Sequence, residues 1–133
     1  LGDVYKRQIY NMQEVMEMSD LVVCRSGAMT ITEIATLGKP AIFIPYPFAT
    51  ENHQEYNAKV LEKVGAAKII LDKELNFTKL NNTINNIVKD TETLKTMGES
   101  AKRVARADVE ENIYKEICRI VSKHETRNNL PPE

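Results

Sequence analysis

The chain has 133 residues, a formal net charge of -1 from 18 basic and 19 acidic residues, and 42% hydrophobic residues. This length suits one compact domain or a part of a larger one, and the balanced charge, with no basic run interleaved with aromatic residues, argues against nucleic acid as a partner. No apolar run approaches the roughly 20 residues that span a bilayer, so a soluble chain is expected.

The chain opens on "LGDVYKRQ", residues 1–8, which shows no periodicity and is expected to be a truncated or non-native lead. A helix is then predicted over 11–19 by residues at i, i+3, i+4 and i+7. These are Met12, Val15, Met16 and Ser19. The short apolar run "DLVVC" at 20–24 is rich in β-branched residues, which predicts a strand covered on both faces.

A second helix is expected to begin near Ala28, because apolar residues recur there at helical spacing, and to end before Gly38. The residues with this spacing are Ala28, Ile31, Ile34 and Ala35. "AIFIP" at 41–45 reads as a second buried strand. Helix and strand therefore alternate along this part of the chain.

A third helix is predicted over His53–Lys63, closed by Gly65, and is followed by a third strand over 66–71. Its expected apolar face consists of Tyr56, Val60 and Leu61. Three strands that alternate with helices predict parallel pairing through right-handed crossovers, in a doubly wound α/β sheet.

The rest of the chain is expected to be helical, over 77–88, 91–104 and 109–121. A frayed tail is predicted from residue 122, and residues 125–133 are taken as flexible, so that the domain proper covers 9–124. Cys24 lies in an apolar run and Cys118 on a helical pattern. This favours reduced, buried thiols and a cytosolic setting over a disulfide framework.

The turn "CRSGA" follows the first strand and precedes a helix, so it should lie at the carboxyl edge of the sheet, where ligands of open α/β sheets bind. Gly27 would let a ligand approach the backbone, and the helix N-terminus offers unpaired N–H groups to an anion. The alternative is purely structural, with Ser26 capping the helix and Gly27 easing a tight turn.

Polar side chains near this turn could hold a sugar nucleotide. Thr30 and Glu33 share one helix face, and the Glu33 carboxylate could bind the two hydroxyls of a ribose or be a surface group favoured by the helix dipole. The loop before the third helix carries His53, Gln54, Glu55 and Asn57, whose donors and acceptors suit sugar hydroxyls. A proton-shuttle role for His53 has little support, since no nucleophile motif lies near it.

Neither a metal nor a bound cofactor is expected. The two His and two Cys residues have no ligand spacing, and the sequence contains no P-loop and no complete G-x-G-x-x-G. The methionines near the start are expected to fill gaps in the core and not to bind a cofactor.

Three stretches together resemble the MurG family of bacterial N-acetylglucosaminyltransferases. They are "IYNMQEVMEMSD" at 9–20, "DLVVCRSGAMTITEIATLGKPAIFIPYP" at 20–47 and "ENHQEYNAKVLEKVGAAKII" at 51–70. The resemblance implies a GT-B glycosyltransferase, in which two Rossmann-like domains face a cleft. This chain resembles the latter half of the domain that binds the sugar donor, with a parallel sheet, flanking helices and a helical C-terminus.

The resemblance also implies a role for individual residues. Ile9 matches a position whose backbone reads uracil, Glu33 matches a ribose-binding glutamate, and Gln54 matches a glutamine that contacts the N-acetylglucosamine hydroxyls. The segment that lines the diphosphate and sugar is matched by Ala28, Met29 and Thr30, and Asn57 falls on a family asparagine. Some members have two glutamines where this chain has His53 and Gln54, so which of the two touches the sugar stays open.

In function, the resemblance implies metal-independent, inverting transfer of N-acetylglucosamine from its UDP donor to lipid I, which forms lipid II for peptidoglycan, on the inner face of the bacterial membrane. The general base would come from the domain that holds lipid I, so no catalytic residue is named here and the fragment alone is expected to be inactive. The alternatives are a stand-alone nucleotide-sugar-binding subunit with a separate membrane partner, and a related sugar-nucleotide epimerase.

Overall fold

The computed structural model describes residues 8–128 and contains a parallel sheet of three short strands. The strands are β1 (Val22–Cys24), β2 (Ala41–Phe43) and β3 (Ala67–Ile69), and they lie in the order β1-β2-β3. Val22 pairs with Ala41, which pairs with Ala67 on its other side. The predicted parallel α/β sheet is confirmed, although each strand is shorter than the apolar run that predicted it.

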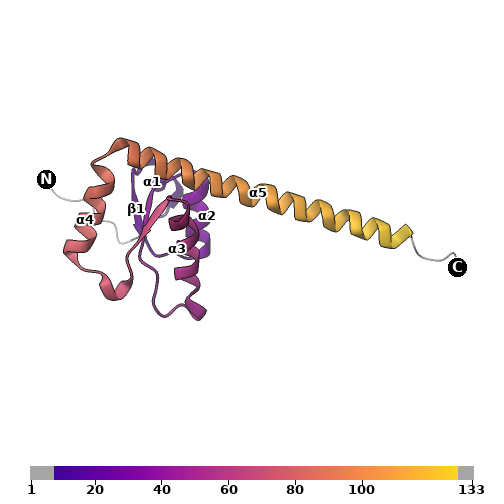
Figure 1. Cartoon of the computed structure of the whole chain (residues 1–133), viewed down its shortest axis with the longest axis horizontal. Helices are drawn as coiled ribbons and strands as arrows, with labels where there is room; N and C mark the ends of the chain where they lie inside the picture. Colours follow the sequence, from indigo (N-terminus) through magenta and orange to yellow (C-terminus); the bar gives the residue numbers. More distant parts are fainter. Residues whose placement is uncertain (1–7, 129–133) are drawn as a thin grey trace.

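One face of the sheet is covered by the two crossover helices, α2 (Ala28–Leu37) and α3 (His53–Lys63), as Figure 1 shows. Part of the long C-terminal helix packs on the same face. The core there is built around Phe43, Ile34 and Leu61, all fully buried. Because successive strands are added in one direction, right-handed crossovers place both helices on one side.

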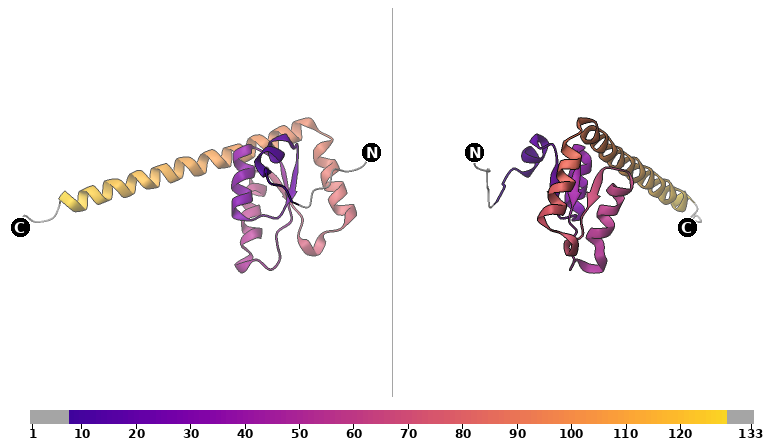
Figure 2. Two further views of the ribbon diagram at one scale, coloured as in Figure 1. Left: turned by 180° about the vertical axis from the view of Figure 1, so that it is seen from behind. Right: turned by 60° about the vertical axis from the view of Figure 1, so that its left-hand side comes forward.

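The other face is covered by α4 (Phe77–Val88) and by the first turns of α5 (Thr91–Asn128). Figure 2 shows α4 and the crossover helices on opposite sides of the sheet. The core on this face contains Ile42, Ile70 and Ile87, each at most 3% exposed. Helices therefore cover both faces, as the fold prediction required.

Two predicted helices near the C-terminus are a single helix. Helix α5 runs unbroken over Thr91–Asn128, and its C-terminal half extends well beyond the sheet (Figures 1 and 2). The predicted break between 104 and 109 is wrong because "ARAD" contains neither Gly nor Pro, and Ala and Arg are strong helix formers. The tail predicted to be frayed from residue 122 is helical to Asn128, while 129–133 lie outside the described residues.

The tight crossing of α2 and α5 depends on two glycines. Gly38 ends α2 in the left-handed region, at φ 65°. A Cβ placed on Gly98 of α5 would lie 2.6 Å from the Gly38 carbonyl oxygen, which is closer than van der Waals contact permits. The absence of a side chain at Gly98 lets α5 approach the end of α2.

Several predicted apolar faces are only partly correct. Helix α1 (Met12–Met18) forms as expected, but only Met16 is buried in it, while Met12 and Val15 are exposed. In α3 the buried apolar residues are Ala58 and Leu61, and the predicted Tyr56 and Val60 are exposed. Helical spacing was therefore right for Leu61 but did not identify Ala58 as the other buried residue of α3.

Strand β1 is also less covered than predicted. Val23 is 39% exposed, whereas every residue of β2 is buried. The strand order explains the difference, because β1 lies at an edge of this three-stranded sheet and β2 lies at its centre. Within residues 8–128, no helix combines the length and the apolar content that crossing a membrane would need.

Candidate sugar-nucleotide site

The carboxyl ends of the three strands meet at one edge of the sheet. Arg25, Ser26 and Gly27 follow β1, and Ile44 begins the segment that follows β2 and leads through the short helix η1 (Thr50–Asn52) into α3. A second short helix, η2 (Asp72–Glu74), follows β3. Loops that are far apart in the sequence therefore lie together at this edge.

Helix α2 begins at this edge with an uncapped first turn. Gly27 is its N-cap residue and makes no side-chain cap, and the first intrahelical bond of the turn runs from the Ile31 N–H to the Gly27 carbonyl. Among the described residues, no partner is recorded for the N–H groups of Ala28, Met29 and Thr30. These three amides and the positive end of the helix dipole can attract an anion.

The purely structural interpretation of this turn is wrong in both parts. Gly27 has φ -63° and ψ 152°, which any residue can adopt, so no tight turn requires a glycine there. A Cβ on Gly27 would meet no atom within 4 Å, so the space above the turn is open. Ser26 does not cap α2, because its hydroxyl is used elsewhere.

Ser26 is fully buried and is fixed by three hydrogen bonds to the start of α3. Its hydroxyl donates to the Gln54 carbonyl oxygen at 2.6 Å, and its N–H donates to Gln54 Oε1 at 3.2 Å. Asn57 Nδ2 donates to the Ser26 carbonyl oxygen at 3.3 Å. These bonds set the position of the α2 N-terminus relative to the α3 N-terminus.

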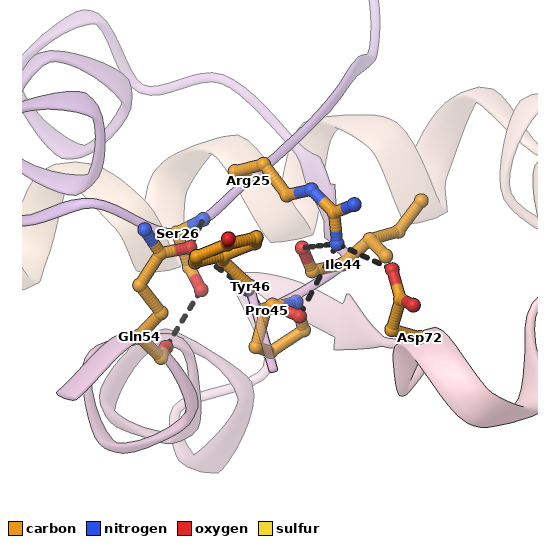
Figure 3. A network of polar contacts seen from close by, with 7 residues as sticks. All are labelled: Arg25, Ser26, Ile44, Pro45, Tyr46, Gln54 and Asp72. Carbon is orange, nitrogen blue, oxygen red and sulfur yellow. Dashed lines mark hydrogen bonds and ion pairs between the residues drawn. The ribbon is translucent and has the colours of Figure 1, made fainter. Parts of the chain in front are cut away.

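Gln54 also holds the loop after β2. Its Oε1 accepts a second hydrogen bond, from the Tyr46 N–H at 2.9 Å, as Figure 3 shows. The amide oxygen is thus occupied by two backbone groups, and no bond within residues 8–128 is recorded for the amide nitrogen. This arrangement leaves the Gln54 amide with N–H groups to donate to a ligand.

Arg25, which has no sequence-predicted role, reaches across the carboxyl edge of the sheet from β1 to the segment after β3. Its Nη1 lies 2.7 Å from Asp72 Oδ1, 3.2 Å from the Ile44 carbonyl oxygen and 3.3 Å from the Pro45 carbonyl oxygen. The guanidinium carbon is also 5.8 Å from the centre of the Tyr46 ring, within cation–π range. The available signal was that Arg25 directly follows the first predicted strand, at 20–24, and Asp72 the third, at 66–71.

Within residues 8–128, the remaining predicted residues make no side-chain hydrogen bond to this network. Glu33 is exposed on the second turn of α2 and lines a pocket of about 190 Å³ together with Gln13 of α1. Thr30 is half-buried, and so is Ile9, which lies before α1. The structure thus brings Gln54 and Asn57 to the α2 turn and places Glu33 one turn away.

His53 is exposed, and its Nε2 lies 3.7 Å from Glu51 Oε2. Glu51 and Asn52 just before it have positive φ values, of 53° and 56°. Neighbouring Gln54, by contrast, is half-buried and bonded to the α2 turn. Of the two side chains that could contact a sugar, Gln54 is the one built into this network.

Cys24 lies at the end of β1 beside this turn, and burial raises the pKa of its thiol to about 11. Neither Cys24 nor Cys118 forms a disulfide. Cys24 is half-buried and Cys118 is exposed, so the prediction that both thiols are buried is wrong for Cys118 and only partly correct for Cys24. A thiol with a pKa of about 11 remains protonated near neutral pH and is a poor nucleophile.

Alkylation of Cys24 is therefore expected to be about a hundredfold slower at pH 8 in the folded protein than in urea, measured with iodoacetamide on a Cys118→Ser variant. The folded protein binds the proton of the Cys24 thiol more tightly than the unfolded chain does. The free energy of unfolding should therefore fall as pH rises from about 8.5 towards 11. Equal Cys24 alkylation rates in the folded protein and in urea would show that the fold does not protect this thiol.

The chain matches the model of the glycosyltransferase family 28 C-terminal domain over residues 4–113. A relative from Thermoanaerobacter sp. (strain X514) is 43% identical over 106 residues, which are 80% of this chain and 29% of the relative. It is named UDP-N-acetylglucosamine--N-acetylmuramyl-(pentapeptide) pyrophosphoryl-undecaprenol N-acetylglucosamine transferase. A Bacillus cereus relative with the same name, numbered 1, is 42% identical over 120 residues, covering 90% of this chain and 33% of the relative.

Among solved structures, the crystal structure of Acinetobacter baumannii MurG matches with a TM-score of 0.67 and 36% identity, over 72% of this chain and 29% of that one. These matches confirm the resemblance inferred from the sequence and the fold class that it implied. The chain spans about a third of the length of the curated relatives that it matches.

Proposed function

The chain belongs to the glycosyltransferase family 28 C-terminal domain family, and on that basis we propose that it forms half of the donor site of a MurG-type transferase. The complete enzyme would move N-acetylglucosamine from UDP-N-acetylglucosamine to lipid I and so make lipid II for peptidoglycan. The observation that supports this most directly is the uncapped N-terminus of α2, which lies beneath open space and is tied to Gln54.

In this proposal the diphosphate of the donor binds over Gly27, at the N–H groups of Ala28, Met29 and Thr30. Negative charge grows on the leaving diphosphate as the bond to the sugar breaks. Backbone N–H groups aimed at that charge bind the transition state more strongly than the ground state. The α2 N-terminus would therefore assist departure of UDP without a metal ion.

The other predicted residues would contact the sugar, ribose and base. The Gln54 amide nitrogen would donate to a hydroxyl of N-acetylglucosamine, and the Asn57 amide would hold the Ser26 carbonyl and so the turn. Glu33 would accept hydrogen bonds from the ribose hydroxyls, and the backbone of Ile9 would read the uracil. The base that deprotonates the acceptor hydroxyl would lie in the domain that binds lipid I.

The lipid-linked acceptor gives the proposed enzyme its location. Lipid I carries a long hydrocarbon chain, so the enzyme would work as a peripheral protein on the inner face of the bacterial membrane. The polar side chains at the carboxyl edge of the sheet would bind a nucleotide sugar that reaches the enzyme from the cytoplasm.

Replacing Glu33 with alanine is expected to weaken binding of UDP-N-acetylglucosamine by the complete enzyme by about 1 to 3 kcal/mol, because two ribose hydroxyls lose a charged acceptor. Isothermal titration calorimetry measures this directly. Glu33 is exposed, so the thermal unfolding temperature should change little.

Glu62→Ala is a suitable control, since Glu62 is an exposed glutamate near the C-terminal end of α3, at the opposite edge of the sheet. Its donor affinity should equal that of the wild type. If Glu33→Ala also binds the donor with unchanged affinity, Glu33 is not part of the site. If the wild-type enzyme does not bind the donor, the proposed function is wrong.

A further inference from the structure

The peptide group that joins Pro45 to Tyr46 is held from both ends. Its carbonyl oxygen accepts a hydrogen bond from Arg25 Nη1 at 3.3 Å, and its N–H donates to Gln54 Oε1 at 2.9 Å. Since the peptide unit is planar and its C=O and N–H point in opposite directions, these two bonds fix the orientation of the plane. Figure 3 shows Arg25 and Gln54 on either side of this segment.

Arg25 makes further contacts with the same segment. Its Nη1 also donates to the Ile44 carbonyl oxygen, and its guanidinium lies against the Tyr46 ring. All three hydrogen bonds come from Nη1, while the planar guanidinium also lies against the Tyr46 ring. A lysine ammonium keeps the charge but has no planar face to place on the ring. The arginine thus restrains both the backbone and the aromatic side chain of the loop after β2.

Asp72 holds Arg25 in place from the third strand. Its Oδ1 lies 2.7 Å from Nη1, and the side chains of Arg25 and Asp72 are 49% and 37% exposed. An ion pair this accessible adds little to the stability of the fold. Its consequence is geometric, because it directs the guanidinium across the carboxyl edge towards Ile44 and Pro45.

We propose that Arg25, held by Asp72, is a positioning residue for the sugar donor. It fixes the Pro45–Tyr46 peptide, this peptide fixes the Gln54 amide, and the Gln54 amide faces the sugar. The inference rests on the proposed function and adds to it two residues that do not themselves contact the donor. Within residues 8–128 the contacts of Arg25 lead through the Pro45–Tyr46 peptide to the Gln54 amide, so the effect is expected on the donor and not on the acceptor.

The test is steady-state kinetics of the complete enzyme with both substrates varied. Arg25→Met is expected to raise the KM for UDP-N-acetylglucosamine about tenfold, the effect of losing hydrogen bonds from one charged group, and to leave the KM for the lipid acceptor unchanged. Asp72→Ala should raise the donor KM less. The double variant should be no worse than Arg25→Met, because Asp72 acts through Arg25.

Two further variants separate positioning from general damage. Arg25→Lys keeps the charge and should recover part of the donor affinity. Glu74→Ala removes an ion pair of similar exposure, to Lys79 at 3.2 Å on the adjoining segment, and should leave the donor KM at the wild-type value.

The proposal is overturned if Arg25→Met leaves the donor KM unchanged, if it raises the KM values of both substrates equally, or if the effects of Arg25→Met and Asp72→Ala multiply in the double variant. Each of these comparisons is made against a wild-type enzyme that transfers N-acetylglucosamine. A wild-type enzyme without donor-dependent transfer would instead contradict the proposed function.

Discussion

Replacing Gln54 with alanine is expected to lower the free energy of unfolding by about 2 to 3 kcal/mol and to weaken donor binding at least tenfold. The variant leaves the N–H of fully buried Ser26 without its acceptor and releases the Tyr46 N–H as well. An unsatisfied buried donor costs about 1 to 3 kcal/mol, and the exposed Tyr46 should add less. Urea unfolding and calorimetric titration with UDP-N-acetylglucosamine measure the two effects.

Gln54→Glu separates those effects, because a carboxylate can accept both backbone N–H groups but has no amide hydrogen to donate to a sugar. We expect near wild-type stability together with weakened donor binding. If Gln54→Glu binds the donor as tightly as the wild type, the side chain only joins the two loops and does not touch the sugar.

Gly98→Ala is expected to destabilise the domain by about 1 to 3 kcal/mol, although alanine is the better helix former by about 1 kcal/mol. The added Cβ would lie 2.6 Å from the Gly38 carbonyl oxygen, so either α5 or the end of α2 must move. Neither can move easily, because Ile34 of α2 and Ala101 of α5 are both fully buried in the same core cluster. Urea unfolding of the complete protein, followed by circular dichroism, measures the loss.

Thr96→Ala provides a matched control for that substitution, since Thr96 is an exposed position two residues earlier in the same helix. It should leave stability the same or slightly higher, from helix propensity alone. If Gly98→Ala is as stable as Thr96→Ala, the close approach of α2 and α5 is not a constraint on the fold.

The fold was largely predictable because its elements have strong local signals. The β-branched run of β1, the Gly38 stop signal and the apolar spacing of α3 each predicted an element close to its observed bounds. The sequence predicted the burial of particular side chains less well. It did not show that Ala58 would pack on the sheet while Tyr56 faces solvent, because that depends on the space between α3 and the sheet.

For the candidate site as well, the location was predictable but the side-chain contacts were not. The carboxyl-edge location of the α2 turn followed from strand–turn–helix order alone, and the structure has it there. The interpretation of Ser26 as a helix cap failed because its hydroxyl bonds to Gln54, 28 residues away in sequence. Arg25 and Asp72 were missed for a similar reason, since a contact between residues 47 apart has no local pattern.

The most direct test of the proposed donor site is a backbone amide NMR titration of the complete enzyme with UDP and, separately, with uridine. If the α2 N-terminus binds the diphosphate, the amide resonances of Ala28, Met29 and Thr30 shift with UDP and stay nearly unchanged with uridine, which has no phosphate groups. Equal shifts with both ligands, or no shift at these three amides when UDP binds, would contradict an anion site at the start of α2.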